Sequence, residues 1–136
     1  MTTTAQTESV SLLRKHAAAH FSAWLMSPDT QDTAALVISE LLTNAVLHGR
    51  DKMTLAIVYT GPALEIVVTD HGKAKAANPP TDPDEHGRGL DIVAAITRDL
   101  QVEKTSHGWR TRAHMDLAPA ETHAQPMALA PQTLSA

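Results

Sequence analysis

Hydrophobic residues near the start of the chain recur with the period of an amphipathic α-helix. Five of them are three or four positions apart and therefore share one helical face: Val10, Leu13, Ala17, Phe21 and Trp24. The pattern predicts a helix that begins near Val10 and ends near Ser27-Pro28. Residues 1–8 are polar and rich in threonine, so we expect a flexible N-terminus before this helix.

A second helix is predicted from about Asp32 to His48. Asp29 or Thr30, in the turn before it, is the expected N-cap, and Gly49 is the expected C-terminal stop. These signals delimit a helix because a short polar side chain satisfies the first free amides and a glycine releases the chain after the last turn.

Two apolar segments rich in β-branched residues follow: MTLAIVYT (53–60) and ALEIVVTD (63–70). The Gly61-Pro62 pair between them predicts a tight turn and hence an antiparallel hairpin. Residues 71–88 hold three prolines and two glycines among polar residues, which predicts a long loop. Long loops in compact domains are usually functional or mobile.

Helical periodicity returns over 89–100, and a final hairpin is expected from 101–105 and 109–117 around the turn SHG. The segment 118–136 is rich in alanine and proline and lacks periodicity, which predicts a disordered tail. Two helices, a hairpin, a helix and a second hairpin predict an α+β two-layer sandwich with its helices on one face of the sheet. One domain over 9–117 suits a chain of 136 residues.

Composition excludes several classes of protein. The chain has no cysteine, so disulfides and thiolate metal sites are excluded and a cytoplasmic location is expected. Its net charge is −4 and no cluster of lysine and arginine stands out, which argues against a nucleic-acid surface. We see no signal peptide, and no apolar run reaches the ~20 residues that a membrane span needs.

The second helix carries an unusual row of polar residues, Glu40, Asn44 and His48, at intervals of four. Such residues lie on one helical face at steps of ~6 Å. A solvated helix face is the alternative, but asparagine is a poor interior helix residue because its side chain competes for backbone hydrogen bonds. An amide oxygen suits Mg²⁺ and a carboxylate can accept a proton, so the row predicts a cleft beside the core that suits a hard cation and a proton acceptor.

Two glycine motifs follow the row. Asp70-x-Gly72 ends the second strand, and Gly87-x-Gly89 precedes the third helix. Glycines at a helix entry let backbone amides approach an anion, although the same pattern also occurs at helix entries that bind nothing. The chain has no P-loop motif, and its Gly-x-Gly lacks the spacing of a Rossmann site.

Taken together and in this order, the motifs resemble those of the GHKL family of ATP-binding domains, which includes gyrase, histidine kinases and MutL. SELLTNAVLHG is similar to the family's N-box, VVTDHG to its first glycine box and HGRGLDIV to its second. The likeness is greatest to the small bacterial anti-sigma factor serine/threonine kinases, over roughly residues 10–117. It implies a Bergerat fold: a two-layer sandwich with a mixed, mostly antiparallel sheet and helices on one face.

The resemblance also implies roles for individual residues, with ATP and Mg²⁺ as cofactors. Glu40 would be the general base, Asn44 would coordinate Mg²⁺, and Asp70 would bind the adenine amino group. Residues 73–86 would form the ATP lid. The remaining nucleotide-binding positions would be His48, to which no chemistry is assigned, Gly72 beside the purine, Gly87, Arg88 and Gly89 around the phosphates, and Leu90.

One position departs from the family pattern: Ala74 stands where a second glycine is common after Asp70. Thr111 is a candidate for a threonine that the family carries on a late strand. The resemblance implies a kinase that phosphorylates an anti-anti-sigma partner, sequesters a sigma factor and thereby regulates transcription. The alternatives are a nucleotide-binding module without catalysis and the catalytic half of a split histidine kinase; a homodimer is left open.

Overall fold

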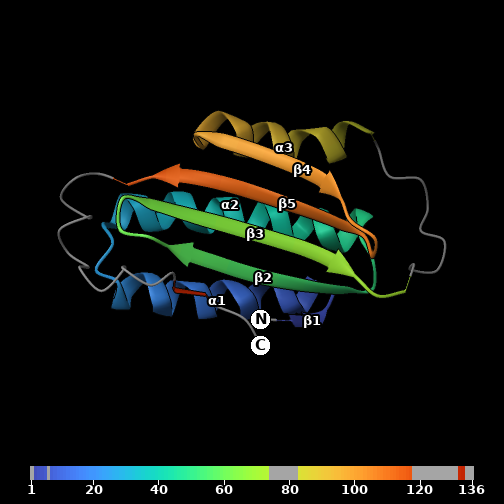
Figure 1. The fold of residues 1–136 in the computed structure, drawn as a ribbon, viewed down its shortest axis with the longest axis horizontal. Coiled ribbons are helices and arrows are strands. Elements are labelled where there is room, and N and C mark those ends of the chain that lie inside the picture. Colours follow the sequence, from blue (N-terminus) through green and yellow to red (C-terminus); the bar gives the residue numbers. More distant parts are fainter. Residues whose placement is uncertain (1, 6, 74–82, 118–131, 134–136) are drawn as a thin grey trace.

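The computed structural model describes residues 2–5, 7–73, 83–117 and 132–133, which form three helices and six strands. Figure 1 shows the long strands side by side as one sheet, with a helix running behind it. In chain order the elements are β1 (Thr2–Thr4), α1 (Thr7–Ala23), α2 (Pro28–His48), β2 (Lys52–Tyr59), β3 (Ala63–His71), α3 (Pro83–Ile96), β4 (Asp99–Lys104), β5 (Trp109–Asp116) and β6 (Gln132–Thr133). This architecture confirms the predicted α+β two-layer sandwich.

The strands are ordered β1-β2-β3-β5-β4, and β6 also pairs with β2. Both predicted hairpins are present, as β2 with β3 and β4 with β5. Every pairing among the described strands is antiparallel, where a mixed, mostly antiparallel sheet was expected. The reason is topological: α3 carries the chain to β4 at the edge of the sheet, and β5 returns between β4 and β3, antiparallel to both.

The core lies between one face of the sheet and the helices. Alternate residues of β2 are buried there and their neighbours are not, which is the period of a strand with one covered face. The core is largely aliphatic, with one aromatic cluster in which the Trp24 and Tyr59 rings lie 5.0 Å apart. All six residues that α2 buries recur at helical spacing: Ala34, Val37, Ile38, Leu41, Leu42 and Ala45.

The second helix begins earlier than predicted. Ser27, not Asp29 or Thr30, is the N-cap, because its Oγ accepts a hydrogen bond of 3.2 Å from the Thr30 N–H. Pro28 then occupies the first turn, where its missing N–H costs nothing. The first helix also differs, ending at Ala23 before a turn in which Leu25 has a φ of +58°.

The predicted long loop over 71–88 is wrong in its second half, since α3 already begins at Pro83. Residues 74–82 lie outside the described residues. The helix also ends earlier than the predicted residue 100, because the Arg98 N–H donates to the His114 carbonyl at 2.9 Å and draws the chain into the sheet. Residues 83–88, expected as loop, are thus helical, and 99–100 are strand.

Both ends of the chain contribute short strands. The N-terminus was expected to be flexible, yet Thr2–Thr4 pair with the outer edge of β2, and the Ala5 N–H donates to the Asp51 carbonyl at 2.8 Å. Gln132–Thr133, within the predicted tail, pair with the far end of the same edge. The other residues of 118–136 lie outside the described residues, so the prediction of disorder is untested there.

Candidate functional site

A cavity of about 300 Å³ lies where the end of α2 meets the last residues of β3 and the first residues of β5. Its walls come from five elements and the Gly49 that follows α2. Four of its lining residues are predicted site residues: Asn44, His48, Asp70 and Leu90. The other four are Gly49, Val102, Trp109 and Thr111. The fold therefore brings together predicted residues that are far apart in the sequence.

The polar row of α2 runs along the border of its buried face. Asn44 and His48 are half-buried and line the cavity. Glu40 is also half-buried but lies one turn earlier and does not line the cavity. The row is therefore neither a solvated face nor fully part of the core, and two of its three members reach the cavity.

Asp70 is the buried carboxylate of the site, with 5% of its surface exposed. Its Oδ1 accepts a hydrogen bond of 3.0 Å from the Arg50 N–H. Within the described part of the chain this is the one hydrogen bond that the carboxylate accepts, so Oδ2 can serve a ligand in the cavity. A buried carboxylate with a single backbone donor favours a ligand that brings its own N–H group.

Two glycines enclose Asp70 from either side. A Cβ on Gly49 would lie 2.7 Å from Cβ and Cγ of Asp70, and a Cβ on Gly108 would lie 2.5 Å from its Oδ1. Gly49 has a φ of −96°, which other residues can also adopt. Glycine is therefore needed there because a side chain would have no space, not because of the backbone conformation. The sequence identified Gly49 only as a helix stop.

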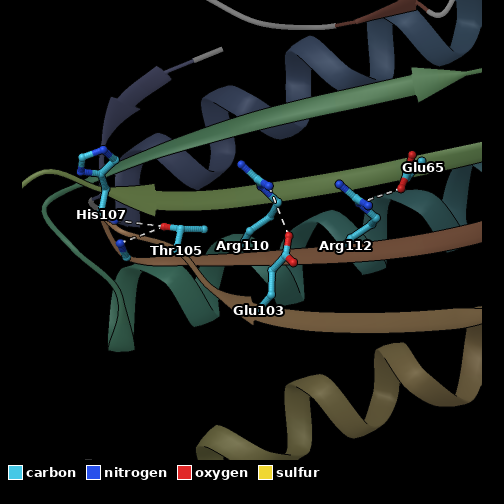
Figure 2. Close-up of polar contacts among 7 residues, drawn as sticks. Glu65, Glu103, Thr105, His107, Arg110 and Arg112 are labelled. Atoms are coloured by element: carbon cyan, nitrogen blue, oxygen red, sulfur yellow. Dashed lines mark hydrogen bonds and ion pairs between the residues drawn. The ribbon is translucent and has the colours of Figure 1, made fainter.

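The turn that carries Gly108 is fixed by Thr105. The Thr105 Oγ1 accepts hydrogen bonds from the N–H groups of His107, at 3.2 Å, and Gly108, at 3.0 Å (Figure 2). The Thr105 N–H also donates to the Gly108 carbonyl at 2.8 Å. This small network holds the start of β5 against Asp70.

The motifs that converge on this cavity are those of a known family. A family model of the histidine kinase-like ATPase domain matches residues 3–115, which is most of the chain. The chain belongs to this family. The match confirms the broader resemblance drawn from the sequence but does not single out the anti-sigma kinases. A search of the curated proteins finds no match.

Membership of the histidine kinase-like ATPase family implies that the chain binds ATP. Among the described residues, the cavity at Asp70 gathers four of the predicted site residues. A larger hollow of about 420 Å³ lies elsewhere, beside the exposed ion pair of Arg98 and Asp116, and no predicted site residue lines it. Among the described residues, no group of three histidine, aspartate or glutamate side chains could hold a metal ion alone.

The predicted glycines have different positions in this ATPase domain. Gly72 does not line the cavity; it has a φ of +91° in the turn after β3, and a Cβ there would meet the Asp51 carboxylate. Asp51 also holds the turn, because its Oδ1 accepts from the Lys73 N–H at 2.8 Å. Gly87, Arg88 and Gly89 belong to α3, and their side-chain surroundings lie outside what the structure describes.

The apolar wall of the cavity was missed by sequence reasoning. Val102 of β4 and Trp109 of β5 line it, and both are about half exposed. Thr111, weighed as a candidate in the sequence, is buried and lines it too. A tryptophan directly after a predicted turn, in a chain so poor in aromatic residues, was the available signal.

The opposite face of the sheet is polar. There Arg110 pairs with Glu103 at 3.2 Å and Arg112 with Glu65 at 2.8 Å (Figure 2). These arginines alternate along β5 with Thr111, which faces the cavity, so they point away from it. Such partly exposed pairs contribute little to stability, and none of their residues lines the cavity.

Proposed function

We propose that this chain is an ATP-dependent serine/threonine protein kinase of the anti-sigma type. It phosphorylates a small anti-anti-sigma partner and sequesters a sigma factor, and so regulates bacterial transcription. The observation that supports this most is the convergence of Asn44, His48 and Asp70 on one cavity in a histidine kinase-like ATPase domain. The finer assignment rests on the sequence likeness of the N-box and the two glycine boxes.

In this proposal Asp70 selects adenine. Its Oδ1 is engaged by the Arg50 N–H, and its Oδ2 accepts a hydrogen bond from the exocyclic amino group of the base. The Thr111 hydroxyl, also on the cavity wall, can donate or accept beside it. Gly72 shapes the turn next to this subsite, and His48 lines the cavity without a chemical role.

The donors present suit magnesium bound together with phosphates. Asn44 offers a neutral amide oxygen at the cavity, and Mg²⁺ commonly takes few protein ligands while it keeps waters and phosphate oxygens. When bound, the ion neutralises negative charge on the polyphosphate. Gly87, Arg88 and Gly89 are proposed to surround the phosphates, with residues 73–86 as the lid.

Glu40 is proposed as the general base. Its carboxylate takes the proton of the acceptor hydroxyl while the hydroxyl oxygen attacks the γ-phosphorus, and the bond to the bridging β–γ oxygen breaks to release ADP. A positioned base contributes about 10²–10⁴-fold to such a transfer. Glu40 is one helical turn from Asn44 and outside the cavity lining, which suits a residue that meets the incoming protein and not the nucleotide.

Transfer of label from γ-³²P-ATP to candidate partner proteins tests the proposal. The Glu40→Gln variant keeps the size of the side chain but removes the base, so it should bind Mg-ATP normally and transfer about 10²–10⁴-fold more slowly. Glu103→Gln, on the opposite sheet face, is the matched control and should transfer at the wild-type rate. Equal transfer by Glu40→Gln and wild type would exclude Glu40 as the base.

A second candidate is a nucleotide-binding module that transfers nothing. Its support is Ala74, which stands in the first glycine box where a second glycine is common. Regulation of the partner that persists unchanged in Glu40→Gln would favour this module over the kinase. If the label on the partner is instead acid-labile, the modified residue is phosphohistidine. The chain would then be the catalytic half of a split histidine kinase.

The remaining parts of the proposal concern location and assembly. We place the protein in the cytoplasm, without a nucleic-acid or membrane partner, and we leave a homodimer to be tested by sedimentation. Among the described residues no helix combines the length and the apolar character needed to cross a membrane.

A further inference from the structure

Two large apolar side chains stand exposed at the mouth of the cavity. Val102 is 48% exposed and Trp109 is 45% exposed, and Leu90, half-buried, also lines the cavity. A single exposed apolar residue is common on any protein, but a group of them at a cavity marks a surface that a ligand covers. None of the nucleotide roles assigned so far uses Val102 or Trp109.

The register of the sheet places Trp109 beside the buried carboxylate. The last pair between β3 and β5 is Thr69 with Arg110, and Asp70 and Trp109 are the residues next to that pair on the two strands. Both side chains face the cavity, so a polar acceptor and a broad apolar surface lie next to each other.

Such a pair suits a flat ligand with polar edges and apolar faces. An edge N–H can reach Asp70, while one face of the ring needs an apolar or aromatic surface to leave water. Heteroaromatic bases have this character, whereas the sugar and the phosphates do not. Stacking on an aromatic side chain is worth about 1–3 kcal/mol per base.

We propose that Trp109, supported by Val102, packs against the face of the nucleotide base and sets the preference of this site for base-bearing ligands over bare polyphosphate. The inference rests on the proposed ATP site and deepens it: Asp70 reads the edge of the base and Trp109 its face. The indole is a binding residue without a part in phosphoryl transfer.

Calorimetric titration tests the role of Trp109. Trp109→Ala should weaken Mg-ATP about 5- to 150-fold, which is the stacking energy expressed as affinity, and Trp109→Phe should recover most of the loss. Tripolyphosphate, which has no base, should bind wild type and Trp109→Ala equally. Leu12→Ala removes a similarly exposed apolar side chain from α1, away from the cavity, and should leave both affinities unchanged.

Fluorescence supplies a second readout that loss of folding would not mimic. The chain has two tryptophans, and Trp24 is in the core, 7% exposed, so Trp24→Phe leaves Trp109 as the single reporter. Its emission should change on saturation with Mg-ATP and stay constant with tripolyphosphate.

Three outcomes would overturn the inference. If Trp109→Ala binds Mg-ATP as tightly as wild type, or if the Trp109 emission does not change when ATP binds, Trp109 does not contact the base. The proposed ATP site would be unaffected by either result. A fall in both ATP and tripolyphosphate affinity would assign Trp109 a general structural role. Failure of the wild type to bind Mg-ATP at all would overturn the proposed function itself and the inference with it.

Discussion

Replacement of Asp70 by asparagine separates ligand recognition from folding. The change Asp70→Asn keeps the size of the side chain and keeps an oxygen for the Arg50 N–H, which donates to Oδ1 at 3.0 Å. It turns the second oxygen into an NH₂ donor. That donor opposes the amino group of adenine but can pair with the carbonyl of guanine.

The expected magnitudes differ for binding and for stability. A hydrogen bond to a charged group contributes about 1.5–3 kcal/mol, so a loss of about 2 kcal/mol would weaken ATP about 30-fold. At a concentration about 100 times the wild-type Kd, Mg-ATP stabilises the wild type by about 2.7 kcal/mol and would stabilise Asp70→Asn by only about 0.9 kcal/mol. Without ligand, the two proteins should unfold within about 1 kcal/mol of each other, because the Arg50 N–H keeps an acceptor.

Asp70→Ala is the matched comparison. It leaves the Arg50 N–H without its acceptor, which costs about 1–3 kcal/mol of unfolding free energy before any ligand is added. Urea unfolding with and without Mg-ATP measures both effects, and Mg-GTP should stabilise Asp70→Asn more than it stabilises wild type. Equal stabilisation of wild type and Asp70→Asn by Mg-ATP would refute the assignment of Asp70 to the base.

Three further changes test other parts of the structure. Ser27→Ala removes the oxygen that caps the Thr30 N–H and should lower the unfolding free energy by about 1 kcal/mol in urea titrations; no change would contradict the cap. Gly49→Ala inserts a Cβ against Asp70, so it should lower the unfolding free energy by about 1–3 kcal/mol and weaken the binding of Mg-ATP. An unchanged unfolding free energy would show that the neighbouring residues can move to accommodate the Cβ. Asn44→Ala should abolish the part of ATP-induced thermal stabilisation that depends on Mg²⁺, and a retained Mg²⁺ dependence would place the ion elsewhere.

Local patterns predicted the elements on which the site is built. Helical periodicity predicted α2 itself, and the recurrence of Glu40, Asn44 and His48 at intervals of four predicted the cavity side that Asn44 and His48 line. Both hairpins followed from short strand-like segments on either side of a turn that contains glycine. These features could be predicted because each depends on residues within a few positions of one another.

The beginning of α3 was missed for a different reason. Pro83 favours the first turn of a helix, but three prolines and two glycines among the polar residues 71–88 predicted a loop, and Gly87 and Gly89 are weak helix formers. In the structure they are inside α3. Intrinsic preference is worth about 1 kcal/mol per glycine, which tertiary packing through residues such as Val93, fully buried, readily overcomes.

The sheet side of the cavity depends on the pairing of strands that are distant in the chain. Trp109 becomes a neighbour of Asp70 only because β5 pairs with β3 in one register, and a shift by one residue would turn the indole to the opposite face. That register is itself held at the cavity end, where Thr105 fixes the turn and Gly108 packs against Asp70. The segment from Thr105 to Trp109 therefore both packs against the Asp70 carboxylate and positions the Trp109 indole. A substitution at Gly108 should then weaken the contacts of the site with both the edge and the face of the base.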